Sequence, residues 1–136
     1  MLKTTKERKP SILKAKNTLW KVFSEYIRRK YSDSEGMCKC VSCFQVKHWK
    51  ELQCGHYISR RYNATLFDEG NNHPQCYSCN IMKQGNIVGY TFFLDDTYGK
   101  YHRHKLFTKS KEIKRFSIHE LEEMTKEYKE KLSKLP

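Results

Sequence analysis

The chain has 136 residues and a formal net charge of +12, from 27 Lys and Arg against 15 Asp and Glu. This length fits one domain, and a hydrophobic share of only 38% predicts a small core that a bound metal would help to stabilise. The charge favours a polyanionic partner, most often nucleic acid, and the sequence contains no apolar run of membrane-spanning length.

Residues 1–10 are polar and basic and end at Pro10, which predicts a flexible arm that contacts phosphates. Because no apolar segment follows this basic start, we expect no signal peptide. The protein is therefore expected in a reducing cytoplasm, where cysteine pairs bind metal more often than they form disulfides.

We expect a single domain over residues 11–136. Apolar residues at spacings of three and four predict a helix over 11–32. Residues 36–99 should form the metal-bearing core, with strands in FQVKHWKELQCGHYI, a short strand over 65–67 and helices over 77–85 and 87–98. Residues 100–136 combine a basic, poorly periodic segment with a last helix, which opens with the capping-box residues Ser117 and Glu120.

Two CxxC pairs predict a structural zinc site. The pairs are Cys40 with Cys43 and Cys76 with Cys79. Each pair can place two thiolates on one tetrahedral ion through a tight turn, and four thiolates complete a closed site. Cys38 could replace Cys40 as a ligand, and the sequence leaves this alternative open. The lone Cys54 is expected to behave as a small buried apolar residue.

Between and just after these pairs lie His56, Asn71, His73 and Asn80. A zinc site with a purely structural role does not need these side chains. Hydrolysis of a phosphodiester, in contrast, needs a neutral histidine to take a proton from water. It also needs a hard cation held by oxygen ligands, and a group that fixes the histidine ring. The alternative roles are an exposed or structural histidine and an asparagine that caps a helix.

The order of these residues resembles the HNH, or His-Me finger, nuclease motif. The resemblance implies an α+β fold, with a zinc-stapled ββα core flanked by N-terminal and C-terminal helices. It implies His56 as general base, Asn71 as the residue that positions it, and Asn80 as a ligand of a catalytic Mg²⁺ or Mn²⁺ ion. Pro74 and Lys83 also match the motif.

More narrowly, the chain resembles the NinG/Rap recombination proteins of lambda-like phages. The similarity rests on LWKVFSEYIRRK, CVSC, CGHYISR, LFDEGNNHPQCYSCN and the GN before an aromatic-rich helix, and it covers residues 13–99 and, more loosely, the last helix. It implies a structure-specific endonuclease that acts on branched DNA, including Holliday junctions and D-loops, in the cytoplasm of a bacterial host. Most HNH enzymes have Asp or His directly before the base, where this chain and the NinG-like proteins have glycine, here Gly55. His73 is the weakest candidate, as a further metal ligand or a phosphate contact.

Arg60 and Arg61 follow His56 closely and are expected to clamp the phosphate, with Lys83 as a further DNA contact. Basic blocks at 3–9, 28–30 and 100–115 predict a broad footprint, although charge does not distinguish junctions from linear DNA. The alternative function is a non-catalytic zinc module that binds DNA or a recombination partner, and a nuclease that acts on RNA is a third. Because junction resolution needs two nicks, a homodimer is attractive, and phage recombination proteins are expected partners.

Overall fold

The computed structural model describes residues 11–136, so the arm predicted over residues 1–10 lies outside the described residues. Helix α1 (Ile12–Lys30) begins at Ser11, whose Oγ accepts a hydrogen bond from the Lys14 backbone N–H at 3.1 Å. Helix α5 (Ile118–Ser133) begins in the same way at Ser117, whose Oγ accepts from the Glu120 N–H at 3.1 Å. Both caps satisfy a backbone donor that the helix leaves free.

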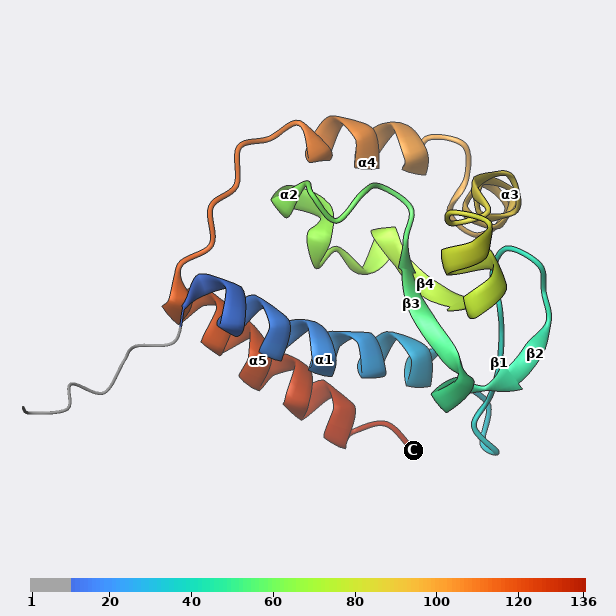
Figure 1. Ribbon diagram of the computed structural model, residues 1–136, viewed down its shortest axis with the longest axis horizontal. Helices are drawn as coiled ribbons and strands as arrows, with labels where there is room; N and C mark the ends of the chain where they lie inside the picture. The colour runs from blue at the N-terminus through green and yellow to red at the C-terminus, as the bar shows by residue number, and fades with distance from the viewer. Residues whose placement is uncertain (1–10) are drawn as a thin grey trace, which may run out of the picture.

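Helices α1 and α5 lie side by side and form the main core (Figure 1). The buried residues Leu19, Phe23 and Ile27 come from one stripe of α1. Phe23 meets Tyr128 of α5 edge to face, with ring centroids 5.0 Å apart. The helical spacing seen in the sequence therefore reflects one buried face, as expected for an amphipathic helix.

Two small antiparallel sheets make up the β part of this mixed α+β fold. Strand β1 (Met37–Lys39) pairs with β2 (Val46–His48), and after a 3₁₀ turn, η1 (Trp49–Glu51), strand β3 (Leu52–His56) pairs with β4 (Asn72–Cys76). The Val41 N–H donates to the Pro74 carbonyl at 3.0 Å, which joins the turn of the first hairpin to β4. The two cysteine pairs are thereby brought to neighbouring ends of the two sheets.

One prediction about the elements was wrong. The strand expected over 65–67 is instead the short helix α2 (Asn63–Leu66), followed by a 3₁₀ turn, η2 (Glu69–Asn71), and the second strand of the pair is β4. The amides of Asn71 and Asn72 hold α2 by donating to the carbonyls of Thr65 and Leu66, both at 3.1 Å. These contacts join side chains to backbone carbonyls six residues earlier, a spacing that the helix and strand patterns of the sequence do not reveal.

The basic segment after residue 100 also contains a helix that the sequence did not predict, α4 (His102–Ser110). It buries only Leu106 and Ser110, too few residues to produce a clear helical period. Arg103 fastens it to α3 through two hydrogen bonds to the Asp95 carboxylate, at 2.7 and 3.0 Å.

A π-helical turn, η3 (Ser78–Met82), follows β4, and helix α3 (Ile87–Tyr98) occupies the predicted range and ends at Gly99. Helix α3 packs closely on the first cysteine turn, because a Cβ on Gly89 would lie 2.1 Å from the carbonyl oxygen of Ser42. Only glycine fits this approach. Within the part of the chain that the structure describes, no helix has both the length and the apolar composition of a membrane span.

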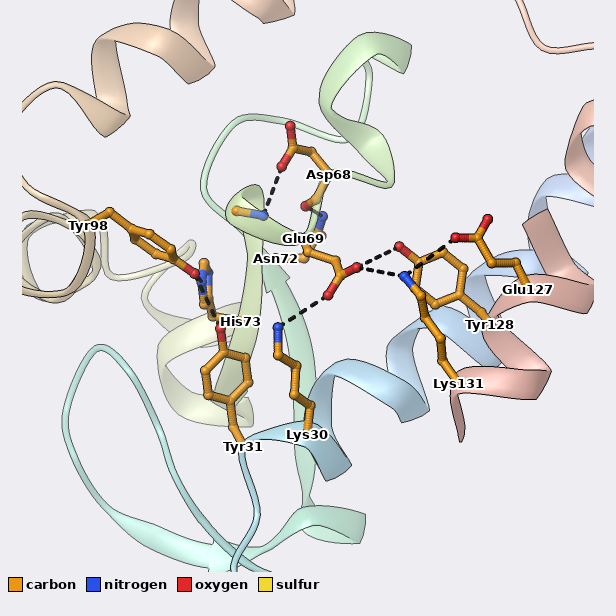
Figure 2. A network of polar contacts seen from close by, with 11 residues as sticks. Lys30, Tyr31, Asp68, Glu69, Asn72, His73, Tyr98, Glu127, Tyr128 and Lys131 are labelled. Carbon is orange, nitrogen blue, oxygen red and sulfur yellow. Dashed lines mark hydrogen bonds and ion pairs between the residues drawn. The ribbon is translucent and has the colours of Figure 1, made fainter. Parts of the chain in front are cut away.

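Glu69 ties three parts of the fold together, as Figure 2 shows. Its carboxylate accepts hydrogen bonds from Lys30 of α1 at 3.2 Å, and from Tyr128 and Lys131 of α5 at 3.0 and 3.3 Å. Burial opposes the charge, but the hydrogen bonds from Lys30 and Tyr128 outweigh it and lower the pKa of Glu69. The network fixes the α1–α5 pair against η2, which leads directly into β4.

Candidate functional site

The four cysteines of the CxxC pairs form one cluster. The thiol sulfurs of Cys40, Cys43, Cys76 and Cys79 all lie within 4.8 Å of one another. A tetrahedral zinc with Zn–S bonds of about 2.3 Å requires sulfurs about 3.8 Å apart, and the Cys43 and Cys76 sulfurs are 3.8 Å apart. The donor set, its spacing and its closed arrangement therefore fit a structural metal such as zinc.

Backbone and side-chain donors already face these sulfurs. The Cys79 N–H points to the Cys76 sulfur and the Asn86 amide points to the Cys79 sulfur, each at 3.4 Å. Donors of this kind stabilise thiolates and orient metal ligands.

Neither of the other two cysteines near the site joins this cluster. The alternative in which Cys38 replaces Cys40 is not supported, because Cys38 lies on β1 outside the four-sulfur group and its thiol contacts the Lys39 carbonyl at 3.8 Å. Cys54 is buried, and burial raises the pKa of its thiol, so it behaves as the small apolar residue that the sequence predicted.

A pocket of about 500 Å³ lies beside this cluster. It brings together three residues predicted for the site, His56, Arg60 and Asn80, with Gln53 and Trp20, which the sequence did not predict. Trp20 comes from α1, Gln53 and His56 from β3, and Asn80 from η3. A helix, a strand and the turn that carries Cys79 therefore all contribute to one concave site.

His56 is held by stacking. Its imidazole lies against the Trp20 indole with ring centroids 4.6 Å apart and an interplanar angle of 15°. Its Nε2 is buried without a hydrogen-bond partner among residues 11–136. Burial, and then the charge of Arg60, lower the pKa of His56 to about 4. The ring is therefore neutral near pH 7, the form that can accept a proton.

Asn71, predicted to position His56, holds the main chain directly after it. Its Oδ1 accepts from the Ile58 N–H at 2.7 Å and its Nδ2 donates to the Ile58 carbonyl at 3.1 Å. Its own carbonyl accepts from the Tyr57 N–H at 2.9 Å. The fully buried Asn71 thus fixes the two residues that follow His56 and positions the histidine through its backbone.

Asn80 is anchored across the pocket by Gln53. The Asn80 Nδ2 donates to Gln53 Oε1 at 2.7 Å, which orients the Asn80 side chain and leaves its Oδ1 available as a ligand. Cys79 precedes Asn80 directly, so a metal on the four thiols also fixes the backbone of Asn80. Gln53 was missed because a glutamine on a strand has no sequence signal that separates this role from an exposed position.

Position 55 has no room for the acid that most HNH enzymes carry before the base. A Cβ on Gly55 would lie 1.8 Å from Gln75 Oε1 and 2.6 Å from Gln75 Cδ. Gln75 is fully buried, and its Nε2 donates to Ser42 Oγ and to the Gly85 carbonyl at 2.8 and 2.7 Å. The missing acid therefore follows from an amide that fills the space.

His73 cannot act as a metal ligand or phosphate contact in this arrangement, contrary to its weak prediction. It is fully buried, and its Nδ1 lies 2.9 Å from the Tyr90 hydroxyl. Its Nε2 lies 2.8 Å from the Tyr98 hydroxyl (Figure 2). The Tyr90 hydroxyl donates to the Gly55 carbonyl at 2.8 Å, so it can only accept from His73 Nδ1–H. Burial lowers the pKa of His73 to about 3. His73 and Tyr90 therefore brace the strand immediately before His56.

The predicted basic contacts separate into two groups. Arg60 lines the pocket, with its guanidinium 5.6 Å from the Trp20 ring centroid. Arg61 is exposed and lies over Tyr62 at 5.8 Å, and Lys83 is exposed at the end of η3. Arg28 also lines the pocket. Arg60 and Arg28 therefore face the site, whereas Arg61 and Lys83 lie on its surroundings.

Comparison with known proteins gives a family match over nearly the whole chain. The family model described as Bacteriophage Lambda NinG protein matches residues 2–136. Protein ninG of Salmonella phage P22 is 38% identical over 61 residues, which are 44% of this chain and 30% of the P22 protein. The matched part thus spans less than a third of that relative. No solved structure matches the chain.

Proposed function

Because this chain belongs to the bacteriophage lambda NinG family, we propose that it is a metal-dependent DNA endonuclease of the HNH type. The observation that carries the proposal is the meeting of His56, Asn80 and Arg60 in one pocket beside the four-thiol cluster. The order of β3, β4 and η3, two antiparallel strands followed by a helical turn, supports an HNH-type core. In this proposal zinc on the thiols is structural and a separate Mg²⁺ or Mn²⁺ ion is catalytic.

His56 serves as the general base. Its neutral ring accepts the proton of the attacking water, a role worth about 10² to 10⁴ in rate. Because the pKa of His56 is lowered to about 4, the base form persists well below neutral pH. The kcat/KM of the free enzyme should therefore not vary through titration of His56 above about pH 6.

Asn80 supplies the protein ligand for the catalytic ion through its Oδ1. A bound divalent ion supplies charge stabilisation to the scissile phosphate and to the leaving oxygen. Within residues 11–136, no Asp or Glu lines this pocket, so the protein offers the ion only neutral amide oxygens. The affinity for the ion should therefore depend strongly on the DNA phosphate, since hard cations prefer anionic oxygen ligands.

Arg60 orients the phosphate, and Arg28 adds positive charge, since its Nε and Nη1 already donate to backbone carbonyls. Guanidinium groups can donate to two phosphate oxygens at once, and both residues line the pocket that holds His56. The net charge of +12 attracts DNA as a whole. The finer assignment, to branched recombination intermediates such as Holliday junctions and D-loops, rests on the family resemblance.

The second candidate is a non-catalytic zinc-containing module that binds DNA or a recombination partner. The absence of a carboxylate among the described residues that line this pocket favours it, because the pocket then offers a divalent ion no anionic ligand. A third candidate is a nuclease that acts on RNA, which the cleavage assay described next would detect.

The test is single-turnover cleavage of linear, forked and four-way DNA, and of matched RNA, with Mg²⁺, Mn²⁺ or EDTA. His56→Ala and Asn80→Ala should reduce cleavage at least 100-fold, while gel-shift affinity in EDTA changes less than twofold. His119→Ala, at an exposed position of α5, is the matched control and should cleave like the wild type. Binding without cleavage by the wild type under every ion would establish the non-catalytic module instead.

A further inference from the structure

Two large apolar side chains stand exposed beside the proposed ion ligand. Ile81 and Met82 directly follow Asn80 in η3, and they are 52% and 72% exposed. Ile81 also lines the pocket that contains His56 and Asn80. Single exposed apolar residues are ordinary, but an adjacent pair at the rim of a polar catalytic pocket points to a function for the pair.

The pair is presented by a rigid turn. The Lys83 N–H donates to the Ser78 carbonyl and the Gly85 N–H donates to the Cys79 carbonyl, both at 2.8 Å. Cys79, one of the four clustered thiols, lies inside this turn. A metal on the thiols would therefore hold the apolar pair in place. A side chain that inserts between stacked bases needs such a rigid support.

The surroundings of the pair match DNA. Lys83 follows Met82 directly and is exposed, and Arg60 and Arg28 line the adjoining pocket. Phosphates would be attracted to this rim, whereas an apolar protein partner would have to cover several unpaired charges. Ile and Met are among the side chains that proteins insert between base steps.

We propose that Ile81 and Met82 form an apolar wedge that enters an opened base step next to the scissile phosphate and so selects branched DNA. The inference rests on the proposed endonuclease site. Ile81 and Met82 directly follow Asn80, so if Asn80 holds the ion on the scissile phosphate, the wedge lies close to that phosphate.

The wedge accounts for a preference that phosphate contacts alone would not give. Entry into an intact duplex requires unstacking of a base step, whereas the step at a branch point is already open. This difference in unstacking should favour a branched substrate about 10- to 100-fold over linear duplex. A contact to a single phosphate can form on either substrate and does not depend on an open base step.

The test uses Ile81→Gln, Met82→Gln and the double variant, with Val88→Gln as the matched control. Val88 is also exposed and apolar, at 68%, but it belongs to α3 and does not line the pocket. The first readout is binding in EDTA to a four-way junction with 2-aminopurine at the branch. Wild-type binding should raise the fluorescence, and the double variant should lose this rise while its affinity for linear duplex stays within twofold.

The second readout is the ratio of junction to duplex cleavage, which should fall about tenfold or more in the double variant and stay unchanged in Val88→Gln. Zinc content and thermal melting of each variant test for a folding defect. Met82→Gln changes the more exposed of the two positions and should disturb the fold least. If the wild type cleaves none of the substrates, the proposed endonuclease function fails. The 2-aminopurine fluorescence would still test whether Ile81 and Met82 enter the branch point. An unchanged fluorescence rise and cleavage ratio in the double variant, or an equal loss in Val88→Gln, would overturn the wedge.

Discussion

Substitution of Gly55 by alanine should destabilise the protein although alanine suits the local backbone. The added Cβ would lie 1.8 Å from Gln75 Oε1, so the buried Gln75 amide must move. Movement breaks its hydrogen bonds to Ser42 and Gly85, each worth about 1 kcal/mol with a further penalty for groups left unpaired. Overpacking adds about 1–3 kcal/mol, and the lower entropy of the unfolded alanine chain returns about 0.4–1 kcal/mol. We expect a net loss of about 2–4 kcal/mol.

A double-mutant cycle tests this reasoning. Gln75→Ala removes the obstacle, so Gly55→Ala should cost little in that background, with a coupling energy of about 2 kcal/mol or more. Urea unfolding followed by tryptophan fluorescence at a fixed free zinc concentration measures all four proteins. A Gly55→Ala variant within about 0.5 kcal/mol of the wild type, the usual range for a neutral surface change, would refute the proposed clash. Additive effects of the two substitutions would refute it as well.

Three further predictions follow from the metal cluster, the base and the polar network. Cys79→Ser should lose bound zinc and melt at a lower temperature, whereas Cys38→Ser should keep one equivalent of zinc. Metal analysis and thermal melting measure both effects. Retention of zinc by Cys79→Ser would reject the four-cysteine ligand set. The pKa of His56 is about 4 in the folded protein and about 6.5 in the unfolded chain. As the pH drops from 6.5 to 4, the unfolded chain binds this proton and the folded protein does not. The free energy of unfolding should therefore fall by up to about 3 kcal/mol over this range. The His56→Ala variant should show a shallower fall in urea titrations, and an equal slope would contradict the burial argument. Glu69→Gln should lower stability by about 1–2 kcal/mol, because a neutral amide weakens charge-assisted hydrogen bonds; calorimetry that shows no change would assign the network no net stability.

The helices that carry local signals could be predicted from the sequence. Ser11 and Ser117 begin α1 and α5, and Gly99 ends α3, because caps and apolar spacing are properties of neighbouring residues. Strand β4 gave no such signal. All five of its residues are buried, yet the segment reads NHPQC, a polar run that resembles a loop. Its side chains are satisfied by distant partners such as Tyr90 and Ser42, which no local pattern reveals.

The residues of the candidate site also divide into those that could be predicted from the sequence and those that could not. Spacing alone identified the four cysteines, because two CxxC turns can meet on one ion. His56, Asn80 and Arg60 were placed by a resemblance, and the pocket brings them together. The stacking of Trp20 on His56 could not be predicted, since an aromatic residue in the buried stripe of a helix normally belongs to the core. Asn71 was expected to position His56 and holds the backbone that follows it, whereas His73 was expected as a ligand or phosphate contact and instead supports the strand before His56.

One short turn joins the metal cluster to the chemistry. Cys79, Asn80 and Ile81 are consecutive, and they contribute in order a thiol to the cluster, an amide to the pocket and an apolar side chain to its rim. The position of all three depends on the turn that carries Cys79, whereas the main core of α1 and α5 contains none of the four clustered cysteines. A metal on the thiols therefore does more than compensate for a small core: it sets the geometry of the segment that would meet the scissile phosphate. In the proposed endonuclease the ion ligand, Asn80, would come from this turn and not from position 55, where Gln75 fills the space beside Gly55.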